Sequence, residues 1–88
     1  MKLTAQMDRL EGRGITLEQL RAFVFIAEYG GFGRAGDELG RTQSTLSAGL
    51  RRLEADVGCR LIERRQGHIL GLTDDGRQLL PAARDILL

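Results

Sequence analysis

Apolar residues recur at helical spacing in several separate segments of the chain, with polar residues between them. Residues 16–29 carry one apolar face, and Thr16 with Gln19 three positions later matches a capping box, which marks the start of a helix. A short second helix is predicted over 32–39, where apolar or small residues recur at intervals of three and four. Glycines follow both segments and are expected to end both helices.

A third helix is predicted over about 42–57, with Thr42 as its N-cap. Its buried stripe has the spacing i, i+4, i+7 and i+11 and consists of Leu46, Leu50, Leu53 and Val57. At 100° per residue, the opposite side presents Ser44, Ser47, Ala48 and Arg51. This outer side is small near the start of the helix and basic further along.

Two short apolar segments then flank Gln66-Gly67, which is a turn signal. They predict a β-hairpin with strands at about 60–64 and 69–72 and with basic residues towards its tip.

A last helix follows Thr73, with acids in its first turn, where the helix dipole favours them. Pro81 inside it should remove one backbone hydrogen bond and bend the helix. Its apolar stripe consists of Leu79, Leu80, Ala83, Ile86 and Leu87. The stripe could be ordinary core, but we favour a contact with the same helix of a second chain, because so small a domain has little core of its own.

The order helix, helix, tight turn, helix, hairpin, helix predicts a winged helix-turn-helix, mainly α with a small β-hairpin. The expected organisation is a flexible N-terminal lead-in at 1–14, the winged domain at 15–73, and a linker or dimerisation helix at 74–88.

Composition adds little to this picture beyond the size class. The 88 residues suffice for one small domain, and a net charge of +1 neither favours nor excludes a nucleic-acid partner. The charge is local, however: three arginines and no acid lie between Arg41 and Leu53. The single Cys59 suits a reducing compartment, and neither a membrane span nor a signal peptide is evident, so we expect a cytoplasmic protein without membrane contact.

The third helix and the hairpin together carry the side chains expected of a DNA-binding surface. Short polar residues at a helix N-terminus can reach base edges in the major groove, and arginines further along suit phosphates. The predicted contacts are Arg34, Thr42, Gln43, Ser44, Thr45, Ser47, Ala48, Arg51, Arg52, Arg64 and Arg65. Each feature has a simpler explanation alone, namely helix capping, a solvated helix face or an exposed turn, and only their joint placement favours DNA.

The chain resembles the N-terminal DNA-binding domain of LysR-type transcriptional regulators from about Ile15 to Leu88. The resemblance is carried by the segments LRAFV, AEYGGFGRA, TQSTLS, RLE, GCRLIER and LTDDG, in this order and spacing. It implies a dimer, paired through the last helix, on an interrupted inverted repeat in promoter DNA. It also implies a ligand-binding domain after the last helix, so we expect the 88 residues to be a truncated part of a regulator.

Within the resemblance, Gln43, Ser44 and Ser47 would face bases, Arg51 or Arg52 a phosphate, and Arg64 or Arg65 would supply the wing contact. The chain departs from the family pattern at Ser44, where Pro is usual, and at Ala48, where Arg is common. Gly49 in mid-helix should cost roughly 1 kcal/mol relative to Ala.

Two other readings remain open from the residues: a winged helix used as a protein-interaction or dimerisation module, and the winged domain of a molybdate-responsive regulator. An enzyme is not expected, because no nucleophile, base and acid set is evident. His68 has no partners at metal-ligand spacing, and we expect no cofactor.

Overall fold

The computed structural model describes residues 14–87. Nearly all of the predicted lead-in (1–13) and the last position of the predicted linker helix (88) lie outside the described part. Its helices are α2 (Leu17–Tyr29), α3 (Phe32–Leu39), α4 (Gln43–Val57) and α5 (Asp74–Leu87). An antiparallel pair, β1 (Ile62–Arg65) and β2 (His68–Leu72), lies between α4 and α5. The order and the mainly helical content confirm the predicted winged helix-turn-helix.

The helix ends follow the capping signals of the sequence. Thr16 and Gln19 form the complete capping box, with Gln19 N–H donating to Thr16 Oγ1 over 3.1 Å and Thr16 N–H donating to Gln19 Oε1 over 3.2 Å. Thr42 caps α4 through its hydroxyl. Left-handed glycines end α2, α3 and α4, as expected where a helix must stop without a β-carbon clash.

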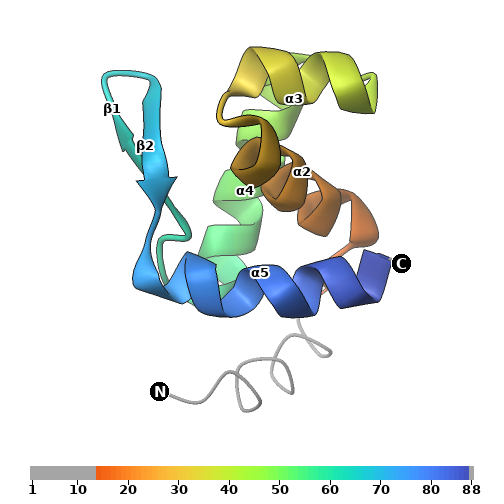
Figure 1. Cartoon of the computed structure of the whole chain (residues 1–88). Coiled ribbons are helices and arrows are strands. Elements are labelled where there is room, and N and C mark those ends of the chain that lie inside the picture. Colours follow the sequence, from red (N-terminus) through yellow and green to blue (C-terminus); the bar gives the residue numbers. More distant parts are fainter. Residues whose placement is uncertain (1–13, 88) are drawn as a thin grey trace.

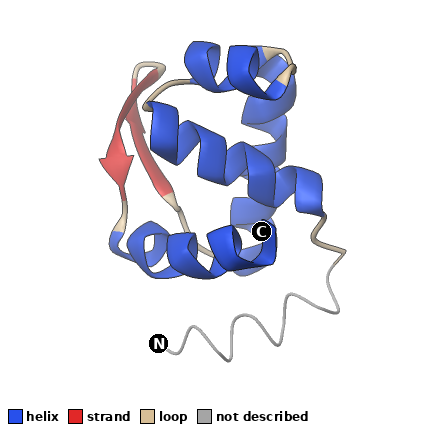
Figure 2. Cartoon of the chain, turned by 45° about the vertical axis from the view of Figure 1, so that its right-hand side comes forward, coloured by secondary structure: helices blue, strands red, loops and turns tan. Residues whose placement is uncertain are grey.

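One hydrophobic core joins the helices and the base of the hairpin. Its largest fully buried side chains are Phe23, Ile26, Leu46, Leu50, Leu53, Leu61 and Ile62. In Figure 1, α4 extends from α3 at the top towards α5 at the bottom, and α2 packs across it. Figure 2 shows the hairpin standing at one side of this helical body.

The first strand begins later than predicted, at Ile62 rather than about residue 60. The backbone of Leu61 is engaged elsewhere: its N–H donates to Glu54 Oε2 over 2.8 Å and its carbonyl accepts from Thr73 N over 3.1 Å. These contacts hold the backbone of Leu61 outside the hairpin, and pairing begins with Ile62 opposite Leu72.

The hairpin turn is the predicted Gln66-Gly67, and both residues have positive φ, 51° and 81°. This is the signature of the tight turns whose twist matches paired strands. A register irregularity between Glu63 and Arg64 leaves Leu70 outside the pairing, and its side chain is 62% exposed.

α5 continues through Pro81 to Leu87. Within the part of the chain that the structure describes, no helix has both the length and the apolar character needed to cross a bilayer.

Candidate nucleic-acid interface

The tight connection between α3 and α4 fixes how α4 is presented. Gly40 and Arg41 both donate their backbone N–H to the carbonyl of Gly36, over 2.8 and 2.9 Å. A β-carbon on Gly36 would lie 2.6 Å from the carbonyl oxygen of Arg41, so the turn requires a very small residue here. This explains the small residues that the sequence places on the inner side of α3.

One side of α4 is buried and the other is exposed, as the helical periodicity predicts. The stripe of Leu46, Leu50, Leu53 and Val57 is buried, whereas the opposite side is solvent-exposed. We call this opposite side the outer face of α4; its exposed members are Ser44, Thr45, Ala48, Arg51, Arg52 and Ala55, and the exposed Gln43 lies beside it in the first turn. Ser47 lies at its edge and is half-buried.

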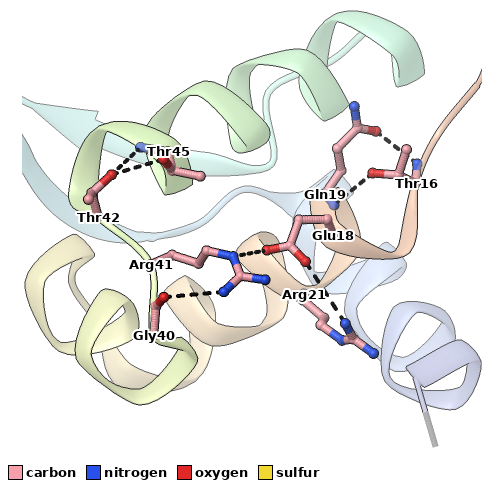
Figure 3. A network of polar contacts seen from close by, with 8 residues as sticks. All are labelled: Thr16, Glu18, Gln19, Arg21, Gly40, Arg41, Thr42 and Thr45. Atoms are coloured by element: carbon pink, nitrogen blue, oxygen red, sulfur yellow. Dashed lines mark hydrogen bonds and ion pairs between the residues drawn. The ribbon is translucent and has the colours of Figure 1, made fainter.

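The two threonines at the start of α4 are partly committed to capping (Figure 3). Thr42 Oγ1 accepts from Thr45 N over 3.1 Å and donates to Thr45 Oγ1 over 2.9 Å. The hydroxyl of Thr42 is therefore fully used in the N-cap, while Thr45 keeps a hydroxyl proton to donate outward. The simpler explanation, capping, thus accounts for Thr42.

Arg41 contributes less local charge than the sequence suggests. Its Nε donates to Glu18 Oε2 over 2.8 Å, and its Nη1 donates to the carbonyl of Gly40 over 3.2 Å. Arg21 lies on the other oxygen of Glu18 at 3.9 Å, as Figure 3 shows. An acid on α2, distant in the sequence, thus balances part of the basic segment.

The remaining arginines separate into two groups. Of the ten arginines among residues 14–87, six form ion pairs: Arg21, Arg41, Arg60, Arg64, Arg77 and Arg84. The other four, without an acidic partner in the described part, are Arg34, Arg51, Arg52 and Arg65, and all four are exposed. Each of them is a predicted DNA contact, whereas only one of the six paired arginines is.

That exception is Arg64, which turns inward. Its side chain is 19% exposed and its Nη2 lies 3.1 Å from Glu54 Oε1. Because successive side chains of a strand alternate, the neighbouring Arg65 is exposed near the hairpin tip. The sequence left Arg64 and Arg65 as equivalent candidates for the wing contact; the structure engages Arg64 within the fold and leaves Arg65 outward.

Arg34 on α3 is positioned by an aromatic ring. Its guanidinium carbon lies 5.9 Å from the centre of the Tyr29 ring, within the range of a cation–π contact. The Gln43 side chain lies close to Gly33 of α3, since a β-carbon on Gly33 would lie 3.4 Å from Gln43 Nε2. The second contact places α3 beside the start of α4.

Glu54 is the functional candidate that the sequence reasoning missed. It is the buried charged residue of the described core, 7% exposed, and it accepts from the backbone of Leu61 and Ile62 as well as from Arg64. A signal existed: at 100° per residue Glu54 lies about 80° from Leu46, next to the apolar stripe. An acid in that place needs internal partners.

The apolar stripe of α5 is partly buried in the domain and partly exposed. Leu79, Leu80 and Ala83 are buried in the core of the single domain, which corrects the expectation that the whole stripe faces a second chain. Leu87 packs partly against the same core. Ile86 is 42% exposed and remains available at the surface. The reason is that α5 packs on α2, where Arg84 Nε also reaches Glu28 Oε2 over 2.9 Å.

Comparison with known proteins gives a family match over most of the domain. The family model described as bacterial regulatory helix-turn-helix protein, lysR family, matches residues 17–77. A probable hydrogen peroxide-inducible genes activator of Mycobacterium xenopi is 53% identical over 72 residues, which is 82% of this chain and 38% of that protein. The uncharacterized HTH-type transcriptional regulator YvbU of Bacillus subtilis is 41% identical over 83% of this chain and 25% of its own length. The chain thus spans about two fifths or less of the length of these relatives, whose names describe a gene activator and a transcriptional regulator.

Solved structures agree. The oxidized form of Corynebacterium glutamicum OxyR is similar with a TM-score of 0.78 and 44% identity, over 83% of this chain and 22% of that one. A complex of the CbnR DNA-binding domain with DNA is similar with a TM-score of 0.76 and 36% identity, over 82% of both chains. The second comparison thus covers most of a DNA-binding domain that was solved on DNA.

Proposed function

The chain belongs to the lysR family of bacterial regulatory helix-turn-helix proteins and is a DNA-binding domain of that family, and from this we propose how it binds. α4 enters the major groove with its outer face, and the wing, residues 62–72, lies on the adjacent groove or backbone. The observation that carries this proposal is the distribution of arginines, since the four without acidic partners lie on α3, on the outer face of α4 and on the wing.

The roles divide by side-chain chemistry. Gln43, Ser44 and Ser47 are short enough to reach base edges without lifting the helix out of the groove. Arg51 and Arg52, two turns later, contact phosphates, and Arg65 makes the wing contact. Phosphate contacts give affinity and orientation, whereas base contacts give preference among sequences.

We propose further that the domain acts as a homodimer on promoter DNA carrying an interrupted inverted repeat, in the cytoplasm. Ile86 supports a contact at the end of α5, because it continues the apolar stripe of this helix onto the surface, where the same helix of a second copy would cover it. The interface rests on the outer side of α5 rather than on its whole apolar stripe.

The direct test selects preferred sites from random duplexes and then titrates the selected duplex at several salt concentrations. Affinity should fall steeply with salt, and Arg52→Ala should lower the slope of log K against log salt by about 0.9 and weaken all duplexes alike. Ser47→Ala or Gln43→Ala should instead change the preference among duplexes.

The matched control is Arg77→Ala, which removes the same charge from α5, where Arg77 pairs with Asp74 over 2.5 Å. It should leave the salt slope unchanged. An equal fall in slope for Arg52→Ala and Arg77→Ala would contradict the assigned surface, and no binding to any duplex would contradict DNA binding itself.

A further inference from the structure

The buried carboxylate of Glu54 adds hydrogen bonds between α4 and the base of the hairpin, which also share the hydrophobic core. It lies one turn before the end of α4, yet its Oε2 accepts the backbone N–H of Leu61 over 2.8 Å and of Ile62 over 3.2 Å. Few direct contacts join the backbones of α4 and the hairpin, which stands to one side of the helices in Figure 1. One side chain thus holds the base of the first strand to the recognition helix.

The other oxygen of the same carboxylate contacts two arginines that flank the start of β1. Glu54 Oε1 receives Arg64 Nη2 at 3.1 Å, and Arg60 Nε lies 3.9 Å away at the other end of the segment. Residues before and after the buried pair Leu61 and Ile62 are therefore tied to one point on α4. Because a carboxylate can accept at both oxygens, it suits a junction where several donors converge.

The same junction continues into the second strand. The carbonyl of Leu61 accepts from Thr73 N over 3.1 Å, and Thr73 Oγ1 donates to the carbonyl of Arg60 over 2.6 Å. Both ends of the hairpin are thereby held at the segment that Glu54 binds. Any shift of this segment moves the whole wing.

The distance from this junction to the tip converts small rotations into large displacements. The turn at Gln66 lies four residues beyond Ile62, or about 13 Å at 3.3 Å per strand residue. A rotation of about 10° at the base would move the tip by about 2 Å, which is more than a hydrogen bond to DNA tolerates. The orientation of Arg65 therefore depends on how firmly the base is held.

We propose that Glu54 is a positioning residue, which sets the direction of the wing relative to α4 and so places Arg65 on the DNA. This inference rests on the proposed DNA binding. Glu54 itself is buried and does not contact DNA. Its loss should remove the contribution of the wing while leaving that of the outer face of α4.

The test is a pair of double-mutant cycles on DNA affinity, measured at a temperature where every variant is folded by circular dichroism. In the parent, Arg65→Ala should weaken binding to the selected duplex about five-fold, and in Glu54→Ala by less than about two-fold. The effect of Ser47→Ala should be the same in both backgrounds. In Glu54→Gln, which keeps one acceptor oxygen, the effect of Arg65→Ala should lie between its values in the parent and in Glu54→Ala. This variant serves as the background if Glu54→Ala does not fold.

The charge control is Glu63→Ala, which removes an exposed acid from the same strand. Loss of a negative charge alone should strengthen DNA binding, so Glu63→Ala should bind as tightly as the parent or tighter, whereas Glu54→Ala should bind more weakly. Tighter binding by Glu54→Ala, or the same Arg65→Ala factor in both backgrounds, would overturn the proposal while leaving DNA binding intact.

A second measurement needs no DNA. Amide hydrogen exchange in Glu54→Ala should accelerate about ten-fold or more in residues 61–72 relative to the amides of α2, because the base of the wing is released without opening the core. Uniform acceleration would mean general destabilisation and would overturn the positioning role. Hydrogen exchange therefore tests the role of Glu54 even if no duplex is bound. Absence of DNA binding would overturn the proposed function and not the structural role of Glu54.

Discussion

Gly76 in the first turn of α5 should not tolerate even a methyl group. It is buried, and a β-carbon there would lie far inside the contact distance of the Leu61 carbonyl oxygen, 3.0 Å from the Leu61 carbonyl carbon and 3.1 Å from Leu72 Cδ2. Two of these neighbours are backbone atoms, which cannot rotate away. Gly76→Ala therefore forces the start of α5 away from the base of the wing.

The cost can be worked from the contacts at this point. Overpacking costs about 1–3 kcal/mol, and the displacement strains the bonds from Thr73 N to Leu61 O and from Gly76 N to Thr73 Oγ1, worth about 1 kcal/mol each. The better helix propensity of alanine returns about 1 kcal/mol. We expect a net loss of about 3 kcal/mol, or about 12–24 °C in Tm for a domain of this size.

Gly49→Ala is the matched control, since it makes the same chemical change in mid-helix. Its β-carbon would meet Ala22 Cβ at 3.5 Å, an ordinary van der Waals contact. Removing a mid-helix glycine should stabilise the domain by up to about 1 kcal/mol. Thermal and urea unfolding followed by circular dichroism measure both. A Gly76→Ala variant as stable as the parent, or the same sign for both variants, would refute the reasoning.

Three further outcomes follow from the placement of side chains. Arg64→Ala should lower the free energy of unfolding by about 1–3 kcal/mol because Glu54 loses the nearer of its two cationic partners. Arg65→Ala should leave unfolding unchanged and weaken DNA binding in titrations; the reverse pattern would exchange their roles. Ile86→Asp should shift the domain from dimer to monomer in light scattering with its circular dichroism unchanged, whereas Leu79→Asp should unfold it, and a monomeric parent at micromolar concentration would remove the dimer. Thr42→Ala should lower the free energy of unfolding by about 1 kcal/mol through loss of the N-cap, and an unchanged urea midpoint would argue against the cap.

Local signals in the sequence were sufficient for the helices and for the hairpin turn. The capping box at Thr16, the N-cap at Thr42 and the turn at Gln66-Gly67 act over a few residues, so each can be read without knowing its surroundings. The leucine stripe of α4 needs only the helical repeat of 3.6 residues. The fold class and the outer face of α4 followed from these signals alone.

Only the tertiary structure decided which charged and apolar side chains remain available at the surface. Arg64 and Arg65 are adjacent and chemically identical, yet Glu54 on another element engages the first and not the second. Leu79 and Ile86 share one apolar stripe, yet the packing of α5 on α2 buries Leu79 and leaves Ile86 outside. The physical reason is that helix and turn signals act between neighbours in the chain, whereas burial and ion pairing depend on residues that meet only after the chain has folded.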